Sequence, residues 1–292
     1  MVKGMAFHHA TWEKERVELG DLRGNAFTII IRNISFTPEE VRTRLEQFSK
    51  EIISGVPNYF GEQRFGGYRN ITHVVGKLLL QDKIEEAVMM YLAQPSEKEE
   101  EDIATARAHL KETHDFGRAL KEFPDKFHFE IVLLNHLVNN PKDFAGAFQK
   151  LPKQTRYLFT HAYQAHVFNR IISDRVKRKL MYPIEGDVLE GGVPTALLPG
   201  ARSSIAKGLA GEIEQSALES EGISPELFRN PKINELGSWG MRKPILLKIS
   251  DFTLHEIGAD VFYPEKTSAR VSFRLEKGAY ATVALRELLK NE

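Results

Sequence analysis

The sequence of 292 residues contains no cysteine. This absence excludes disulfide bonds, thiol catalysis and metal sites with thiolate ligands. A chain without cysteine fits a reducing compartment, so we expect a cytoplasmic protein. Its stability must then come from a hydrophobic core, and the chain is long enough for one large domain or two ordinary ones.

Long apolar runs are also absent. The longest, such as Thr28–Ile31 and Leu78–Leu80, are much shorter than the roughly 20 apolar residues that a membrane-spanning helix needs. Residues 1–20 contain histidines and charged side chains where a signal peptide has its apolar core. The sequence therefore predicts neither a membrane segment nor a signal peptide.

Net charge is absent as well, since 40 basic residues balance 40 acidic ones. The two signs are unevenly distributed along the chain. Between Lys150 and Lys179 there are eight lysines and arginines against the single acid Asp174. Acidic residues gather instead in Pro95–Asp102, which we expect to be a solvated loop or the start of a helix. A neutral average is thus compatible with one strongly positive face.

Local patterns predict strands at both ends of the chain and helices between them. β-branched residues predict a strand over Ala26–Ile34, and Thr37 with Glu40 forms the pattern of a helix capping box. Further helices are expected between Asn70 and Gln149, over Thr155–Lys179, over Gly211–Ser220 and from Tyr280 to Lys290. Turns and linkers are expected around the helix in 181–243. Further strands are expected over Pro244–Ser250, Ala259–Tyr263 and Ala269–Leu275. This order predicts an α+β fold in which a helical domain, residues 55–236, is inserted into a sheet-based domain, residues 1–54 and 237–292.

The stretch GVPNYFGEQRFGG, Gly55–Gly67, is unusual in composition. It combines four glycines and three aromatic rings with polar residues, so it suits neither a helix interior nor a buried strand. We expect a shaped loop at the crossing between the two domains, where binding sites tend to form.

Several segments together resemble the TruD family of tRNA pseudouridine synthases. The stretch NYFGEQRFG, Asn58–Gly66, is close to a family signature, and GDLRGNAF, Gly20–Phe27, is similar to its second active-site strand. Further similar segments follow in the family's order: AYQAHVFN at 162–169, LLPG at 197–200, GEIE at 211–214, RKPILL at 242–247 and KGAYATVALREL at 277–288. The resemblance implies a catalytic sheet of the pseudouridine synthase type, incomplete in this sequence, with the helical insertion as the TRUD domain.

The resemblance also implies an activity and a set of site residues. The family isomerises uridine in tRNA, commonly at position 13, with an aspartate nucleophile and without a metal or organic cofactor. By resemblance, Asn25 positions that aspartate, Phe27 stacks on the flipped uracil, and Arg286 lies near the active site. The residues that the resemblance assigns to RNA binding are Asn58, Tyr59, Phe60, Gln63, Arg64, Phe65, Arg170, Arg175, Lys177 and Arg242. We expect tRNA as the partner and a monomeric protein.

One element of the family pattern is not found in the sequence. The family's nucleophile lies in a Gly-x-Lys-Asp segment before the GDLRGNAF strand, whereas none of the nineteen residues before Gly20 is an aspartate. Between Val188 and Val193 the sequence is also shorter than the family pattern. We therefore expect part of a longer synthase, and the alternative is an RNA-binding module that has lost the chemistry.

Each candidate residue also has a purely structural interpretation. Phe27 on a β-branched strand would be a core residue, and Asn25 after Gly24 would be a turn residue. The rings of the Gly55–Gly67 loop would fasten it to the core, and the basic helix would be a solvated face. The ten histidines indicate metal binding only weakly, because His161 and His166 are five residues apart rather than four.

Overall fold

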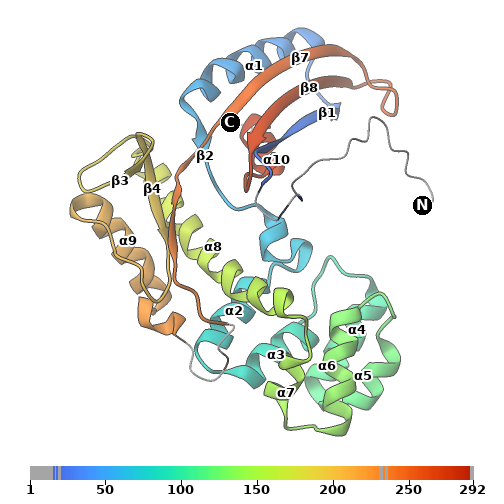
Figure 1. The fold of residues 1–292 in the computed structure, drawn as a ribbon. Coiled ribbons are helices and arrows are strands. Elements are labelled where there is room, and N and C mark those ends of the chain that lie inside the picture. The colour runs from blue at the N-terminus through green and yellow to red at the C-terminus, as the bar shows by residue number, and fades with distance from the viewer. Residues whose placement is uncertain (1–15, 17, 19–20, 230–232, 234–235, 290–292) are drawn as a thin grey trace. The chain divides into compact units, whose positions relative to one another are not determined.

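The computed structural model describes residues 16, 18, 21–229, 233 and 236–289 (Figure 1). The chain divides into two compact units, one of Met1–Ser49 with Ile249–Ala279 and one of Lys50–Lys248 with Tyr280–Glu292. We call them the sheet unit and the helical unit. Helices and antiparallel strands both contribute, so the expected α+β class is confirmed.

The sheet unit contains three antiparallel strands in the order β1, β8, β7, with bounds Gly24–Ile34, Thr267–Glu276 and Ile249–Ala259. Side chains along the central strand β8 alternate between buried and more exposed positions, and Val271, Phe273 and Leu275 are buried. This alternation is what the sequence predicts for a strand with one face in a core. The residue opposite Phe273 on β1 is Phe27.

Helix α1, Pro38–Glu51, follows β1 and lies along the sheet (Figure 1). Its capping box is confirmed: the Glu40 carboxylate accepts from the Thr37 backbone N–H at 2.8 Å, and the Thr37 hydroxyl accepts from the Glu40 N–H at 3.4 Å. Val41, Leu45 and Phe48 form its buried face. The Phe48 ring meets the Phe252 ring of β7 edge-on at 5.4 Å, which fastens the helix to the sheet.

The expected strand over Ala259–Tyr263 is wrong, because β7 ends at Ala259 and a turn follows. Asp260 organises this turn. Its carboxylate accepts from the backbone N–H groups of Asn33 and Phe262, at 2.8 and 2.9 Å, and from the Arg32 guanidinium at 3.0 Å. Burial alone would raise the pKa of Asp260, but these donors outweigh it and hold the pKa below its usual value.

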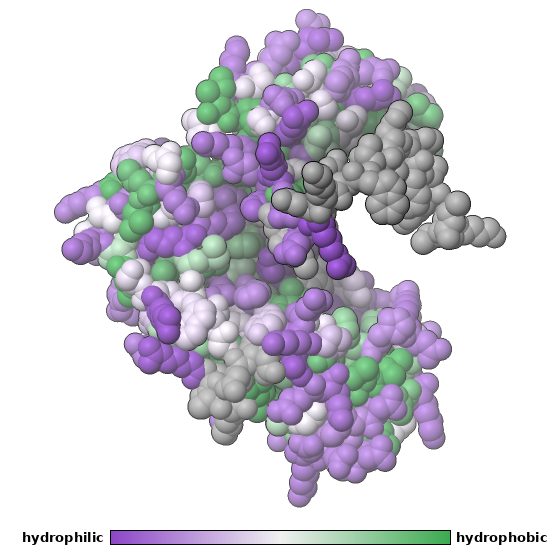
Figure 2. Space-filling view, in the orientation of Figure 1, coloured by the Kyte–Doolittle hydropathy of each residue, from purple (hydrophilic) through white to green (hydrophobic). Residues whose placement is uncertain are grey.

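Short helices form the first part of the helical unit, broken near Pro95, Pro124 and Pro141 as the sequence predicts. They are α2 Thr72–Leu80, α3 Ile84–Ala93, α4 Glu101–Thr113, α5 Phe116–Glu122, α6 His128–Asn139 and α7 Phe144–Gln149. One core cluster joins them, with fully buried residues such as Leu92, Leu110 and Leu134. Figure 2 shows mainly hydrophilic residues on the outside of α4 to α6.

The long helix α8, Lys153–Lys177, confirms the helix expected over Thr155–Lys179 and packs against α2. The close approach depends on Gly76, because a Cβ there would collide with the Phe159 carbonyl group. Phe168 and Ile172 are fully buried as expected, whereas Leu158, expected in the same apolar stripe, is 39% exposed. None of the helices in the described residues is long and apolar enough to cross a membrane.

The acidic segment Pro95–Asp102 is not solvated throughout. The Glu99 side chain is fully buried and pairs with Arg107 of α4 at 3.0 Å, and Arg107 also pairs with Glu130 of α6 at 3.1 Å. Burying such charges is tolerable only where opposite charges and hydrogen bonds compensate them. A charge-rich segment is usually exposed to solvent. Here the Glu99 side chain is buried instead, because Arg107 compensates its charge.

Residues 181–243, expected as turns around one helix, also contain strands. A second three-stranded sheet has the order β3, β4, β5, with bounds Val188–Glu190, Val193–Leu198 and Met241–Pro244. The loop between β3 and β4 is Gly191–Gly192, both at positive φ, which suits a two-residue hairpin. The remaining elements are helix α9 Gly208–Glu221, the pair β2 Val56–Pro57 and β6 Leu246–Leu247, and the closing helix α10 Ala281–Leu288.

Candidate functional site

The Gly55–Gly67 stretch is a defined loop of the helical unit, as the sequence predicts. It begins with β2, which pairs with β6, and continues into a short 3-10 helix over Glu62–Phe65. Asn58 anchors the strand end, because its backbone N–H donates to the Ile245 carbonyl and its side-chain amide donates to the Pro244 carbonyl, both at 2.8 Å. The loop is thus held to the RKPILL segment by two specific hydrogen bonds.

Asn169 of α8 fixes the next part of the loop. Its side-chain amide donates to the Phe60 carbonyl at 3.0 Å, and its side-chain oxygen accepts from the Phe60 N–H at 2.9 Å. Both backbone groups of Phe60 are therefore satisfied by one side chain. The AYQAHVFN segment of α8 thus positions the aromatic loop, a role that spacing along the sequence does not reveal.

The three rings of the loop have different environments. Phe65 is 8% exposed and meets His73 edge-on at 5.4 Å, so it fastens the loop to α2. Tyr59 and Phe60 are half-buried. Phe60 contacts Phe168 at 5.5 Å and Tyr280 at 6.1 Å, the latter next to α10. Phe65 therefore fits the structural interpretation, in which the ring fastens the loop to the core. Tyr59 and Phe60 remain partly accessible to solvent.

Cations accompany the two accessible rings. The Arg64 guanidinium carbon lies 5.4 Å from the centre of the Phe60 ring, and that of Arg286 lies 4.8 Å from the centre of the Tyr59 ring. Lys243 of β5 also approaches Phe60, with its Nζ at 5.1 Å. We call Tyr59, Phe60, Arg64, Lys243 and Arg286 the aromatic–cation cluster. Cations over ring faces are stabilised by the ring quadrupole and still have unused hydrogen-bond donors.

Lys243 and Asn169 were not expected as site residues. Nothing in the RKPILL segment distinguishes Lys243 from a surface lysine, since its aromatic neighbours come from distant parts of the chain. Gln63, which was expected to bind RNA, is exposed on the loop.

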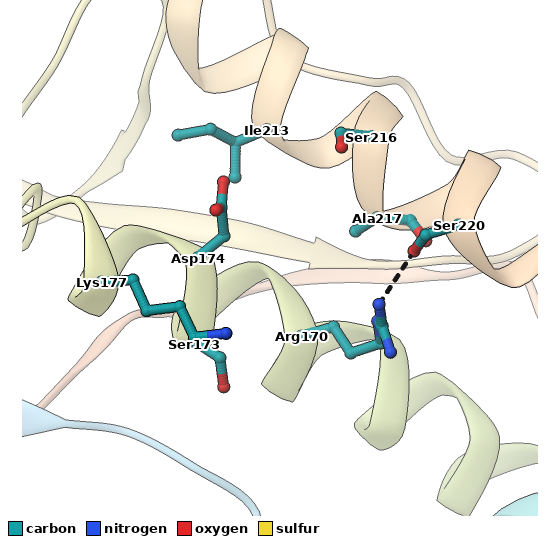
Figure 3. A pocket seen from close by; sticks show the side chains of 8 residues that line it. All are labelled: Arg170, Ser173, Asp174, Lys177, Ile213, Ser216, Ala217 and Ser220. Atoms are coloured by element: carbon teal, nitrogen blue, oxygen red, sulfur yellow. Dashed lines mark hydrogen bonds between the residues drawn. The ribbon is translucent and has the colours of Figure 1, made fainter.

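A second feature lies between α8 and α9, where a hollow of about 360 Å³ opens (Figure 3). Arg170, Ser173, Asp174 and Lys177 line it from α8, and Ile213, Ser216, Ala217 and Ser220 from α9. Arg170 donates to the Ser220 hydroxyl at 3.2 Å, and Ser173 shares a hydrogen bond of 3.3 Å with the Tyr59 hydroxyl. The hollow therefore adjoins the aromatic–cation cluster and combines two cations and the carboxylate of Asp174 with several hydroxyl groups.

Three of the expected RNA-binding arginines have internal partners. Arg170 pairs with Glu221 at 3.4 Å but is about half exposed, whereas the donors of Arg175 and Arg242 are mostly used inside the fold. Arg175 is 2% exposed and forms a bidentate pair with Asp187 at 2.6 and 2.9 Å, while its guanidinium also donates to the carbonyls of Leu180 and Tyr182. Arg242 pairs with buried Glu214 and donates to Thr195. This geometry argues against phosphate contacts by either residue. Arg175 instead holds the chain that follows α8, and Arg242 holds the second sheet.

Asn25 and Phe27 lie on β1 of the sheet unit, two residues apart and therefore on one face. The Phe27 ring is half-buried and lies 5.6 Å from the buried Phe273 ring, while Asn25 is exposed near the strand end. Gly24 allows this strand pairing, because a Cβ there would collide with the Leu275 carbonyl oxygen. A hollow of about 340 Å³ opens beside Asn25, lined also by Arg23, Ser250 and Arg274.

An α+β chain that presents aromatic rings beside arginine and lysine has the surface chemistry of RNA-binding proteins. Comparison with known proteins identifies the family. The family model of tRNA pseudouridine synthase D (TruD) matches residues 1–192 and 190–288. The chain belongs to the TruD family of tRNA pseudouridine synthases, so the resemblance seen in the sequence is confirmed.

Individual relatives agree with this assignment. The chain is 38% identical to a "Probable tRNA pseudouridine synthase D" of Methanosarcina acetivorans over 95% of its own length and 70% of that protein. It is 41% identical to a protein of the same name from Methanopyrus kandleri, over 96% of the chain and 68% of the relative. The crystal structure of the TruD protein from Methanosarcina mazei superposes with a TM-score of 0.84 at 36% identity, covering 95% of this chain and 71% of that one. The alternative of a non-catalytic RNA-binding module finds no support in these relatives.

Proposed function

We propose that this chain binds tRNA through the aromatic–cation cluster and contributes to converting uridine into pseudouridine, commonly at position 13. As a family member it is an isomerase, and the cluster is the observation that carries the RNA-binding part. Isomerisation breaks the N-glycosidic bond and rejoins the base through carbon. The target base must first leave its stack, which costs a few kcal/mol, and protein groups that bind splayed RNA offset this cost.

The helical unit supplies groups suited to structured RNA. The accessible faces of Tyr59 and Phe60 can stack against unpaired bases, and Arg64 and Arg286 can form forked hydrogen bonds to phosphates. The hollow between α8 and α9 adds Arg170 and Lys177 beside serine hydroxyls, a combination suited to a backbone phosphate. Asn58 shapes the loop, and exposed Gln63 is available to the RNA.

The sheet unit supplies the residues assigned to chemistry. We propose that Asn25 orients the aspartate nucleophile of the family mechanism and that Phe27 stacks on the flipped uracil. Their positions on one face of β1, with the Phe273 ring of β8 beside that of Phe27, support this assignment. We further propose residues 1–54 and 237–292 as the catalytic domain and residues 55–236 as the TRUD domain. The monomeric state and the cytoplasmic location stay predictions, to be tested by sedimentation and by localisation of a tagged chain.

Deletion of the gene in its native host tests the function directly. Chemical mapping of pseudouridine in total tRNA should show one modified position lost on deletion and restored by the wild-type gene. A gene with Asn25→Ala should fail to restore it, whereas Asn139→Ala, a change at an exposed residue of α6, should succeed. An unchanged pseudouridine map after deletion would refute the proposed function.

A further inference from the structure

Lys243 is a half-buried lysine without a counter-ion. Its Nζ lies 5.1 Å from the centre of the Phe60 ring and 5.4 Å from that of Phe168, and Phe168 is fully buried. Within the described part of the chain, no carboxylate pairs with it and no hydrogen bond fixes it. A buried ammonium group is costly unless an anion or several acceptors compensate it, and two ring faces compensate only in part.

The consequence for its protonation is large. Burial lowers the pKa of Lys243 from 10.5 to about 7, and no neighbouring charge contributes to the shift. A lysine with this pKa is about half protonated at neutral pH. Both its charge and its affinity for anions then depend on whether a negative charge lies beside it.

The other charged or titratable groups on the adjoining elements have their own environments. Arg64 approaches Phe60, and Tyr280 contacts the same ring. Arg286 lies over Tyr59 and pairs with Glu287 at 3.2 Å. Arg242 pairs with Glu214, and Arg170 pairs with Glu221. His161 of α8 has a pKa lowered by burial and by Arg64. None of them supplies a negative charge to Lys243.

We infer that Lys243 is an RNA-phosphate-binding residue that takes up a proton when the RNA docks on the aromatic–cation cluster. The geometry points to an anion as the missing partner, because the site already has aromatic faces and two further cations. A phosphodiester of a tRNA bound to this cluster has the required charge. The inference rests on the proposed function and adds to it a residue and a proton linkage.

Proton uptake makes binding pH-dependent in a defined direction. A bound phosphate stabilises the ammonium form and raises the pKa of Lys243 in the complex. Between the free and the bound pKa, affinity then falls as pH rises, by roughly five- to tenfold per pH unit above pH 7. Lys243→Arg removes this slope, since arginine stays charged throughout.

The test measures binding of an unmodified tRNA transcript by the full chain between about pH 6.5 and 8.5 at constant salt. Calorimetry in two buffers of different ionisation enthalpy should give roughly one-half to one proton taken up per tRNA near pH 8. Lys243→Arg should abolish this uptake, and Lys248→Met, which changes an exposed lysine nearby, should leave it intact. Inorganic sulfate in place of tRNA, an oxyanion that does not titrate in this pH range, should produce no comparable uptake.

A stability measurement separates this role from a structural one. The folded pKa lies below the unfolded pKa, so the lysine destabilises the fold as pH falls from 10.5 towards 7. Lys243→Met should therefore raise the thermal midpoint at pH 7 while weakening tRNA binding at pH 6.5. A lysine needed for packing would lower the midpoint instead.

The outcomes separate the two proposals. Equal pH slopes for wild type and Lys243→Arg, with tRNA still bound, overturn the role of Lys243 and leave the proposed function standing. Proton uptake with inorganic sulfate alone assigns the site to small free oxyanions and overturns the RNA assignment. A folded chain that binds no tRNA at low salt overturns the RNA-binding proposal and this inference with it.

Discussion

The side-chain amide of Asn169 satisfies both backbone polar groups of Phe60, at 3.0 and 2.9 Å. This pair ties the aromatic loop to the middle of α8, so the position of Phe60 is set by a residue far away in sequence. A loop held in this way is pre-ordered for its ligand, which lowers the entropic cost of binding.

Removing this amide should loosen the loop. Asn169→Ala leaves the Phe60 N–H and C=O without partners, which should cost about 1 to 3 kcal/mol of unfolding free energy. tRNA affinity should fall several-fold with it. Denaturant unfolding and a binding titration check both, with Asn139→Ala as the surface control, for which less than about 0.5 kcal/mol is expected. Equal effects of the two changes would contradict a positioning role for Asn169.

Arg175 should matter for stability and not for RNA. Arg175→Met leaves Asp187 buried without its partner, so we expect a loss of about 3 to 5 kcal/mol in unfolding free energy. The control is Arg178→Met, three residues on, whose pair with Asp174 is partly exposed and worth no more than about 1 kcal/mol. Where the Arg175 variant remains folded, the salt dependence of its tRNA affinity should equal that of wild type. A reduced salt slope would show that Arg175 contacts phosphate after all.

His73 should make the protein less stable in mild acid. Its ring stacks on His166 at 4.5 Å, and burial first and the His166 charge second lower its pKa from 6.5 to about 4. Because the folded pKa is below the unfolded one, the unfolded chain binds the extra proton between these values. Stability attributable to His73 is thus complete above pH 6.5 and falls as pH drops towards 4.

The expected size is roughly 1 to 2 kcal/mol, since His73 retains some contact with water. His73→Phe keeps an aromatic ring and should flatten this part of the pH dependence in urea unfolding at pH 7.5 and pH 5. His128→Gln, a change at an exposed histidine, should leave the dependence as in wild type. An unchanged acid sensitivity in His73→Phe would contradict the assignment.

Local chemistry in the sequence predicted much of the fold. The Thr37–Glu40 capping box, the alternation in β8 and the long α8 depend on neighbours in the chain, and all three are confirmed. The β3–β4 hairpin was missed, although Gly191–Gly192 between two short apolar segments is a recognisable turn signal. The pattern was hidden by the surrounding glycines and prolines, which favour loops on average.

The site was less predictable, because its contacts join distant segments. The Gly55–Gly67 loop was recognisable from its composition. Asn169, which holds the loop through Phe60, and Lys243, which contacts the Phe60 ring, were not recognisable from the sequence. Arg175 and Arg242 were expected to bind RNA because the family resemblance assigned them to it. Their partners Asp187 and Glu214 are separate in sequence, so only the folded structure reveals that these charges are used internally.

The most direct test of the account is the affinity of the folded chain for a tRNA transcript between about 50 and about 200 mM salt. The account predicts tight, salt-dependent binding, with Arg64→Ala and Lys177→Ala each weakening it and lowering the slope of log affinity against log salt by about one. Lys142→Ala, a change at an exposed lysine before α7, should leave both unchanged. Failure of the folded wild-type chain to bind tRNA at low salt, or equal losses in all three variants, would contradict the central claim.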